Sequence, residues 1–301
     1  MQTHYIITES ESGLTVQEFI RQHCRISARE YQRLMRAKKI LLNKKPPYSK
    51  RLLKTGDKIT MHAPKDNTYG VVPETHPLTI LYEDDRLLVI AKPPYTAVHP
   101  MGKTTMHTLS NYVAGYYAAN GSLHTVRPVH RLDRNTSGCI LFAKTKEAQQ
   151  DLGRQLQEGR CKRTYLAVVK GALPAPAGSF TDPIAVSPHS PNQRCVSAAG
   201  EPSHTDYTVL EEKNGHSLLL LSLRTGRTHQ IRVHLAHAGA PIVGDSMYGV
   251  PSPLIKRQAL HALRLRWQNT NGQICEAASP LPNDWKTLWN QLEFSSAFPF
   301  E

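Results

Sequence analysis

Positive charge is distributed unevenly along this chain of 301 residues. Residues 1–65 contain 14 Lys or Arg and 5 Asp or Glu, a net charge of +9, whereas the rest of the chain contains 23 and 19, a net charge of +4. The stretch PKDNTYGVVPETHP at 64–77 is rich in Pro, Gly and Asn and has little periodicity. We therefore expect a small basic domain at residues 1–63, a linker at 64–77 and a larger, nearly charge-balanced domain at 78–301.

The remaining composition excludes several classes of protein. No apolar run approaches the roughly 20 residues that span a bilayer, and the first residues, MQTHYIITESES, lack the basic and apolar regions of a secretory signal. The five cysteines are odd in number and widely spaced, which argues against disulfides and against a Cys-based zinc site. His234 and His237 are close together but form no metal-binding motif. We expect a cytoplasmic, monomeric protein with no metal site and no membrane association.

Two helix starts are recognisable in the basic domain. Thr15 with Glu18, and Ser27 with Glu30, each fit the capping-box pattern, in which a Ser or Thr precedes a Glu by three residues. Two short apolar strands follow in ILLNKKPPYSKRLLKTGDKITMH, with turn residues at Asn43–Lys45.

The second of these helices has a cationic face. Arg29, Arg33 and Arg36 are spaced at i, i+4 and i+7, and Lys38 and Lys39 follow directly. Side chains of like charge on one face repel one another unless an anion lies across them. The pattern fits either a solvated face of a packing domain or a surface that follows the phosphates of RNA.

Residues 13–62 resemble the S-four (alpha-L) RNA-binding module, which a small-subunit ribosomal protein shares with several RNA-modifying enzymes. The resemblance is carried by SAREYQRLMRAKKILLNKK and by the closing KTGDKI. Two features differ from the usual pattern: LTVQEF replaces a common Arg-Leu-Asp opening, and NKK stands where a glycine is usual. The resemblance implies that this domain binds RNA.

The larger domain alternates irregularly between strand and helix patterns. We predict strands at 80–82, 87–91, 164–171, 216–230 and 259–267, and helices at 104–119, 146–159 and 229–239, the last ending at Gly239. In the last strand His261, Leu263, Leu265 and Trp267 alternate with Leu260, Ala262, Arg264 and Arg266, which is typical of a half-buried strand. Because strands outnumber helices and do not alternate strictly with them, we expect an α+β fold with a mixed or antiparallel sheet.

Three basic segments contain the candidate catalytic residues: HRLDRNTSG at 130–138, CKRTYLAVV at 161–169 and RTGRTHQIRVH at 224–234. Together they contain one carboxylate, Asp133. Glycoside hydrolysis requires two carboxylates, and phosphoryl transfer uses a metal, acidic metal ligands and a nucleotide loop. A single ionised carboxylate is instead a possible nucleophile, since a neighbouring guanidinium favours the ionised form and burial opposes it.

The residue types alone leave structural alternatives open. Asp133 fits equally well in an Arg–Asp pair that supports the Thr136–Gly138 turn, Tyr165 fits a core strand, and Arg232 fits a solvated helix face. Arg131 and Arg134, on either side of the acid, suit a phosphate or the position of an extruded base.

HRLDRNTSG closely resembles the catalytic motif of the RluA-type pseudouridine synthases. The resemblance extends through nearly all of residues 78–301 and includes VIAKPP, RPVHRLDRNTSGCILFAKT, KRTYLAVVKG, RTGRTHQIRVHLAHAGAPIVGDSMYG and ALHALRL, in that order. An N-terminal S-four-like module is a common companion in this family. The stretch KPPYTAVHP departs from the usual pattern, which has a glycine after the prolines, and this difference bears on substrate specificity rather than on the chemistry.

The resemblance implies a role for each matched residue. Asp133 corresponds to the essential aspartate, which attacks a flipped uridine at the base or at the sugar carbon, so that the base detaches, rotates and rejoins through carbon-5. Tyr165 corresponds to the tyrosine that packs on the base and assists removal of the carbon-5 proton, and Arg232 to the arginine that pairs with the aspartate. Arg131 corresponds to the arginine that helps to displace the base, and Leu263 to an aliphatic wall of the pocket.

The function implied is isomerisation of uridine to pseudouridine in RNA, most specifically in large-subunit ribosomal RNA, because members dedicated to transfer RNA often lack the S-four-like module. Isomerisation leaves the composition of the substrate unchanged and therefore requires no cofactor or metal, and we expect RNA rather than DNA as the partner. Other possibilities are a synthase acting on transfer RNA, a non-catalytic RNA-binding or ribosome-assembly factor, and a nucleoside hydrolase. The residues predicted to contact RNA are Arg29, Arg33, Arg36, Lys38, Lys39, Arg131, Arg134 and Arg227.

Overall fold

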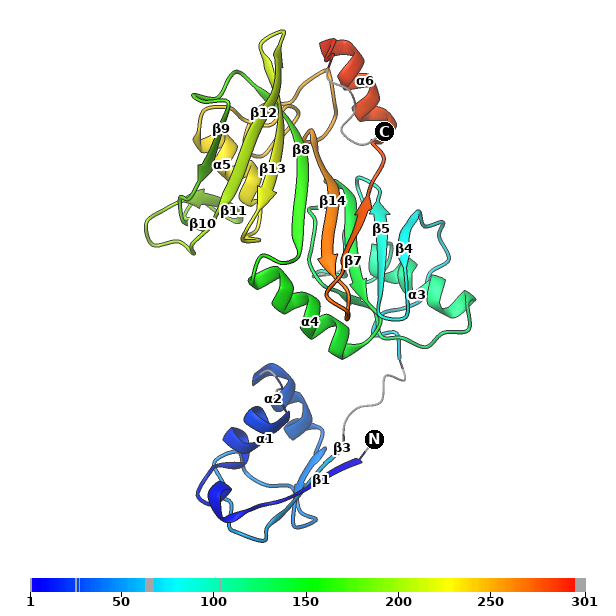
Figure 1. Cartoon of the computed structure of the whole chain (residues 1–301), viewed down its shortest axis with the longest axis vertical. Helices are drawn as coiled ribbons and strands as arrows, with labels where there is room; N and C mark the ends of the chain where they lie inside the picture. Colours follow the sequence, from blue (N-terminus) through cyan, green and yellow to red (C-terminus); the bar gives the residue numbers. More distant parts are fainter. Residues whose placement is uncertain (1, 25, 27, 63–67, 103, 296–301) are drawn as a thin grey trace. The chain divides into compact units, whose positions relative to one another are not determined.

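The chain folds into two compact units, Met1–Asn67 and Thr68–Glu301 (Figure 1). The computed structural model describes residues 2–24, 26, 28–62, 68–102 and 104–295. Each unit has its own cluster of buried apolar side chains. Among the described residues, no helix has both the length and the apolar character needed to cross a membrane.

The first unit packs two helices against a three-stranded antiparallel sheet of order β1-β3-β2. Phe19, Ile20, Tyr31, Leu34 and Ile59 belong to its buried cluster. The elements are β1 (Gln2–Ile6), η1 (Glu9–Glu11), α1 (Val16–Cys24), α2 (Ala28–Arg36), β2 (Ile40–Leu42) and β3 (Lys58–His62).

The sequence predicts two capping boxes and a turn at Asn43–Lys45 in this unit. The Glu18 amide donates to Thr15 Oγ1 at 3.2 Å and the Thr15 amide donates to Glu18 Oε2 at 2.8 Å, so the first capping box is confirmed. The second box begins at Ser27, which lies outside the described residues. Asn43 and Lys44 both have positive φ, the geometry of a two-residue hairpin turn, although neither is glycine.

The second unit contains the larger sheet and four helices within its described residues. Its elements are β4 (Ile80–Glu83), β5 (Leu87–Lys92), α3 (Leu109–Ala119), β6 (Arg127–Pro128), β7 (Ser137–Ala143), α4 (Lys146–Gln157), β8 (Lys162–Lys170), β9 (Ala177–Phe180), β10 (Ile184–Ser187), β11 (Ser190–Val196), β12 (Thr205–Lys213), β13 (His216–Leu223), α5 (Gln230–His237), β14 (Leu260–Gln268), β15 (Ile274–Ala278) and α6 (Asn283–Leu292).

Ten strands of the described part of this unit form one sheet, in the order β4-β5-β7-β14-β8-β13-β12-β9 with β6 beside β7 and β15 beside β14. Neighbouring strands run antiparallel except β7 and β14, which are parallel. Helix α4 contacts β7 and β14, whereas α5 contacts β11 and β12 (Figure 1). The mixed sheet confirms the predicted α+β class.

Two predicted boundaries are wrong. The strand predicted at 216–230 ends at Leu223, because the Gln230 carboxamide oxygen accepts hydrogen bonds from Thr225 Oγ1 (2.8 Å) and the Arg227 amide (2.9 Å) and holds the intervening residues as a loop. The helix predicted from residue 104 begins at Leu109, where the Thr108 side chain caps it.

The predicted alternation of β14 holds only in its second half. Leu265 and Trp267 are buried and alternate with the half-buried Arg264 and Arg266, whereas Leu260–Leu263 are all buried. The first half of the strand lies in the middle of the sheet, between β7 and β8, and both of its faces are covered.

Part of the predicted linker packs on α3. The Glu74 amide donates to the Asn111 carbonyl at 3.0 Å, the Asn111 side chain donates to the Val72 carbonyl at 2.8 Å, and His76 stacks on Tyr112. Residues 63–67 lie outside the described part of the chain.

Gly138 lets β7 and β14 meet. Its φ is +113°, and a Cβ at this position would lie 2.1 Å from the carbonyl oxygen of Ala262 on β14. No L-residue fits this combination of backbone conformation and contact without displacing a strand.

We predict that Gly138→Ala lowers the free energy of unfolding by about 3 kcal/mol or more, through backbone strain and the clash with Ala262. Gly153→Ala is the matched control, because Gly153 lies in α4 with nothing within 4 Å of the added carbon. That variant is expected to gain about 0.5–1 kcal/mol. Urea denaturation measures both, and similar midpoints for the two variants would contradict the expectation.

Candidate active site

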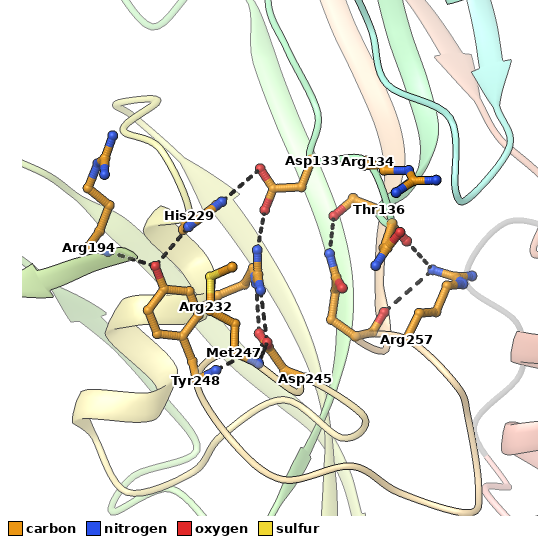
Figure 2. Close-up of polar contacts among 12 residues, drawn as sticks. Asp133, Arg134, Thr136, Arg194, His229, Arg232, Asp245, Met247, Tyr248 and Arg257 are labelled. Atoms are coloured by element: carbon orange, nitrogen blue, oxygen red, sulfur yellow. Dashed lines mark hydrogen bonds and ion pairs between the residues drawn. The ribbon is translucent and has the colours of Figure 1, made fainter. Parts of the chain in front are cut away.

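Asp133 lies in the loop between β6 and β7, in a turn closed by the Thr136 amide, which donates to the Asp133 carbonyl at 3.1 Å. Side chains from the segment before β14 hold this loop (Figure 2). Arg257 Nη1 donates to the Asn135 carbonyl at 2.9 Å, and the Gln258 carboxamide donates to Thr136 Oγ1 at 3.3 Å. The position of the carboxylate is therefore fixed by residues more than 120 positions later in the chain.

Lys92 supports the same loop from β5. Its side chain is 1% exposed, and its ammonium donates to the carbonyls of Pro93 (2.8 Å), Thr96 (2.9 Å) and Arg134 (3.0 Å). The three acceptors belong to two loops, so this one cation fastens the segment after β5 to the segment that carries Asp133. Burial lowers the pKa of Lys92 to about 7.

Arg232 joins two carboxylates (Figure 2). Its Nη1 lies 2.9 Å from Asp133 Oδ2, while Nε and Nη2 lie 2.7 and 2.8 Å from the two oxygens of Asp245. The exposed fractions of the three side chains are 17% for Asp133, 7% for Arg232 and 1% for Asp245. Burial disfavours the charged guanidinium, but the hydrogen bonds and ion pairs with Asp245 and Asp133 raise the pKa of Arg232 above its usual value.

His229 borders the other oxygen of Asp133. Its Nε2 lies 3.9 Å from Asp133 Oδ1, and its Nδ1 lies 2.7 Å from Tyr248 Oη, which also accepts from the Arg194 amide at 2.8 Å (Figure 2). Burial lowers the pKa of His229, which favours the neutral imidazole. The direction of the hydrogen bond between Tyr248 Oη and His229 Nδ1 depends on the tautomer of the imidazole, since the phenol oxygen can donate one hydrogen bond or accept a second.

A cavity of about 510 Å³ brings together five residues that the sequence predicted as separate pieces: Asp133, Tyr165, Arg232, Arg131 and Arg227. Among the described residues that line it, Asp133 is the sole carboxylate. The cavity is thus cationic apart from one acid.

The apolar wall of this cavity differs from the prediction. Leu260 and Ile231 line it, whereas Leu263 lies in the buried core and does not. Tyr165 is 4% exposed and lies within β8, paired with Ala262 of β14. Burial raises the pKa of Tyr165, so its phenol is neutral near pH 7.

The remaining residues predicted to contact RNA lie in different surroundings. Arg134 is exposed, and its Nε donates to the Tyr95 carbonyl at 3.1 Å. Arg227 does line the cavity but also pairs with Glu201. The side chain of Arg29 is outside the described part of the structure. The other predicted RNA contacts of the first unit, Arg33, Arg36, Lys38 and Lys39, are exposed.

Four residues of the site were missed from the sequence: Asp245, His229, Tyr248 and Lys92. Asp245 follows the apolar PIVG segment as a lone acid, which is a weak signal of a buried partner for a cation. No pattern of neighbouring residues identifies His229 or Tyr248 as site residues, because the hydrogen bond between them joins two different segments of the chain. No group of three or more His, Cys, Asp or Glu in the described residues is arranged to hold a metal ion.

Comparison with known proteins identifies the family. A family model described as RNA pseudouridylate synthase matches residues 86–237, a range that contains Asp133, Tyr165 and Arg232. The chain belongs to the RNA pseudouridine synthase family. This synthase is 37% identical to the uncharacterized RNA pseudouridine synthase YhcT of Bacillus subtilis, over 94% of this chain and 95% of that protein.

Further relatives support the same assignment. Ribosomal large subunit pseudouridine synthase D of Nitrosomonas europaea is 42% identical over 74% of this chain and 67% of its own length. Among solved structures, human RNA pseudouridylate synthase domain containing 1 shares 26% identity with a TM-score of 0.57, covering 74% of this chain and 87% of that one. Human RNA pseudouridylate synthase domain containing 4, at 21% identity and a TM-score of 0.59 over 71% of this chain and 93% of that one, shows the same fold.

We predict that Asp245→Asn destabilises the synthase by about 3–5 kcal/mol, because it leaves Arg232 without its buried bidentate partner. Glu276→Gln is the control, since Glu276 pairs with Arg264 and Arg266 at the surface and a change of about 0–1 kcal/mol is expected. Guanidinium denaturation checks both. Equal losses in the two variants would show that the Asp245 pair does not stabilise Arg232.

The lowered pKa of Lys92 predicts a pH-dependent stability. An unfolded lysine keeps its proton to about pH 10.4, whereas native Lys92 releases it near pH 7. Between these values the unfolded state binds more protons, so stability rises with pH. The free energy of unfolding of wild type relative to Lys92→Met should therefore rise above pH 7, by up to about 1.4 kcal/mol per unit. A difference that stays constant from pH 6 to 9 would refute this.

Proposed function

We propose that this synthase converts uridine to pseudouridine in RNA, with Asp133 as the nucleophile. The observation that carries the proposal is the position of this carboxylate. It is the one acid among the described residues of a cationic cavity, one of its oxygens is held by Arg232, and Arg232 is itself held by Asp245. Glycoside hydrolysis by paired carboxylates does not fit this arrangement, because it requires a second acid in the same cavity.

The reaction rearranges bonds without changing composition. The Asp133 carboxylate adds to the flipped uridine at the sugar carbon or at the base, and the bond between N1 and the sugar breaks. The base turns and carbon-5 bonds to the sugar carbon. The bond between Asp133 and the substrate then breaks and restores the carboxylate, the carbon-5 proton leaves, and N1 gains a proton. Arg232 holds one oxygen of the carboxylate at 2.9 Å and so orients it before the attack.

Two cavity residues fit roles in holding the base. The neutral, buried Tyr165 offers an aromatic ring to the uracil, and the aliphatic Leu260 and Ile231 line the same cavity. Arg131 is exposed at the same cavity and suits the displacement of the base from its stack, which costs a few kcal/mol. Phosphate contacts by the cationic surface offset this cost.

We assign large-subunit ribosomal RNA as the substrate, with a cytoplasmic monomer as the acting species. Several relatives are named as ribosomal large subunit pseudouridine synthases. The first unit, proposed here as an S-four-like RNA-binding domain, exposes Arg33, Arg36, Lys38 and Lys39 near α2. Such a surface suits the phosphates of a large folded RNA.

The substrate assignment is tested by mapping pseudouridines in all RNA of cells with and without the protein. We expect at least one large-subunit ribosomal site to disappear with the protein and to return with the wild-type gene. Loss of a transfer-RNA site alone would overturn the assignment but keep the chemistry. Release of free uracil, instead of a product of unchanged mass, would overturn the chemistry.

Asp133→Asn should reduce product formation at least about a thousandfold, because the carboxamide is not a nucleophile. RNA affinity should remain within a few-fold of wild type, since the base is still held by its other contacts. Asp151→Asn is the control, as Asp151 lies on α4 outside the cavity and pairs with Arg86. A tritium-release assay and filter binding give the two readouts. Turnover by the Asp133→Asn variant would remove the nucleophile assignment.

A further inference from the structure

Arg163 is a buried cation in the active-site cavity for which the reaction described above has no use. It lies on β8 two residues before Tyr165, so both side chains point to the same face of the sheet. The side chain of Arg163 lines the cavity and only 8% of the residue is exposed. The cation is therefore largely removed from water at a place that the substrate enters.

The structure gives Arg163 few partners. Its Nη2 donates to the Thr225 carbonyl at 2.9 Å, and its buried Nε has no hydrogen-bond partner. Within residues 68–102 and 104–295, no carboxylate lies within 4 Å of this guanidinium. The backbone of Gly226 passes close against it, since a Cβ there would lie 2.8 Å from Arg163 Nη1.

Arg232 and Arg257 are equally buried but each meets a carboxylate, Asp245 and Asp284 respectively. Asp133, the carboxylate of the same cavity, is paired with Arg232. Two other titratable neighbours of Arg163, His130 and Cys161, carry no negative charge. Burial, with the nearby Arg163 charge, lowers the pKa of His130 to about 3, and burial raises the pKa of Cys161 to about 11. Burying a cation without an anionic partner is strongly unfavourable unless a ligand brings one.

We propose that Arg163 binds a backbone phosphate of the RNA next to the flipped uridine. This inference rests on the proposed function, which supplies the RNA strand, and it adds a binding residue that the sequence analysis did not name. A planar guanidinium matches the oxygens of a phosphate and binds them with two N–H donors. The loop at Thr225 and Gly226 holds that guanidinium in place before the RNA arrives.

A phosphate fits the site better than an oxygen of the base. A uracil carbonyl is neutral and leaves the charge of Arg163 unbalanced, whereas a phosphate neutralises it. Residues two apart on one strand are separated by roughly 7 Å. A base packed on Tyr165 therefore leaves Arg163 within reach of the sugar-phosphate backbone on the same side of the cavity.

The test is the salt dependence of RNA binding, which counts phosphate contacts. Poly(uridylic acid) is the probe, because it presents a uridine in every register, and affinity is measured by filter binding from 50 to 400 mM KCl (on the order of the range over which such contacts are resolved). The variants are Arg163→Gln, Arg163→Lys and the charge-matched control Arg266→Gln. Arg266 lies on β14 outside the cavity and pairs with Glu276.

We expect Arg163→Gln to weaken binding about tenfold at low salt and to reduce the slope of log affinity against log salt by about 0.7, the value for one phosphate of a single strand. Arg163→Lys should keep the slope, and Arg266→Gln should change neither quantity. The urea midpoint of Arg163→Gln without RNA should equal or exceed that of wild type, because an unbalanced buried charge is removed. An unchanged slope overturns the proposal. If the urea midpoint of Arg163→Gln is also lower than that of wild type, the role of Arg163 is structural.

Failure of the proposed function gives a different result. If wild type forms no pseudouridine in ribosomal or transfer RNA while the slope of Arg163→Gln still falls, the phosphate site stands and the chemistry does not. If wild type is active and the slope is unchanged, the chemistry stands and the phosphate site does not.

Discussion

The site depends on one guanidinium shared between two carboxylates. Asp245 is almost fully buried and takes two donors of Arg232, and backbone amides of Met247 and Tyr248 donate to the same carboxylate. This arrangement prevents Arg232 from turning away and leaves one of its donors for Asp133. Asp133 is thereby oriented through one oxygen only. Its second oxygen faces His229 at 3.9 Å and the cavity, where a substrate can approach.

The sheet brings these residues together where β7 and β14 pair in parallel, the single parallel pair among its described strands. Strands β7 and β14 pair only at His261 with Ser137 and at Ala262 with Gly138, next to the loop that carries Asp133. Tyr165 lies opposite Ala262 on the next strand, so the same few residue pairs place both the acid and the aromatic ring. Two buried cations hold the loop that carries Asp133 through its backbone carbonyls. Lys92 donates to the carbonyl of Arg134, and Arg257 donates to that of Asn135.

Local physical chemistry made much of the fold predictable. Capping at Thr15 involves contacts within a few residues and formed as predicted. The predicted stop at Gly239 is also local: α5 ends at His237, and Gly239 follows the C-cap with a φ of +78°. The predictions failed where distant groups decide the structure. The strand after His216 stops at Leu223 because Gln230 folds the loop back, and the first half of β14 is buried on both faces because two neighbouring strands enclose it.

By itself the sequence determined the fold class and the three segments that carry the acid, the tyrosine and the arginine, because these follow from residue types and short spacings. The family came from the resemblance of these segments to known motifs. Only the tertiary structure decided which groups meet. Asp245, His229, Tyr248 and Lys92 entered the site through contacts between separate segments, and Arg163 proved to be buried with no carboxylate of the described residues within 4 Å. The physical reason is that burial and ion pairing depend on the whole surroundings of a side chain, whereas sequence patterns record only its neighbours along the chain.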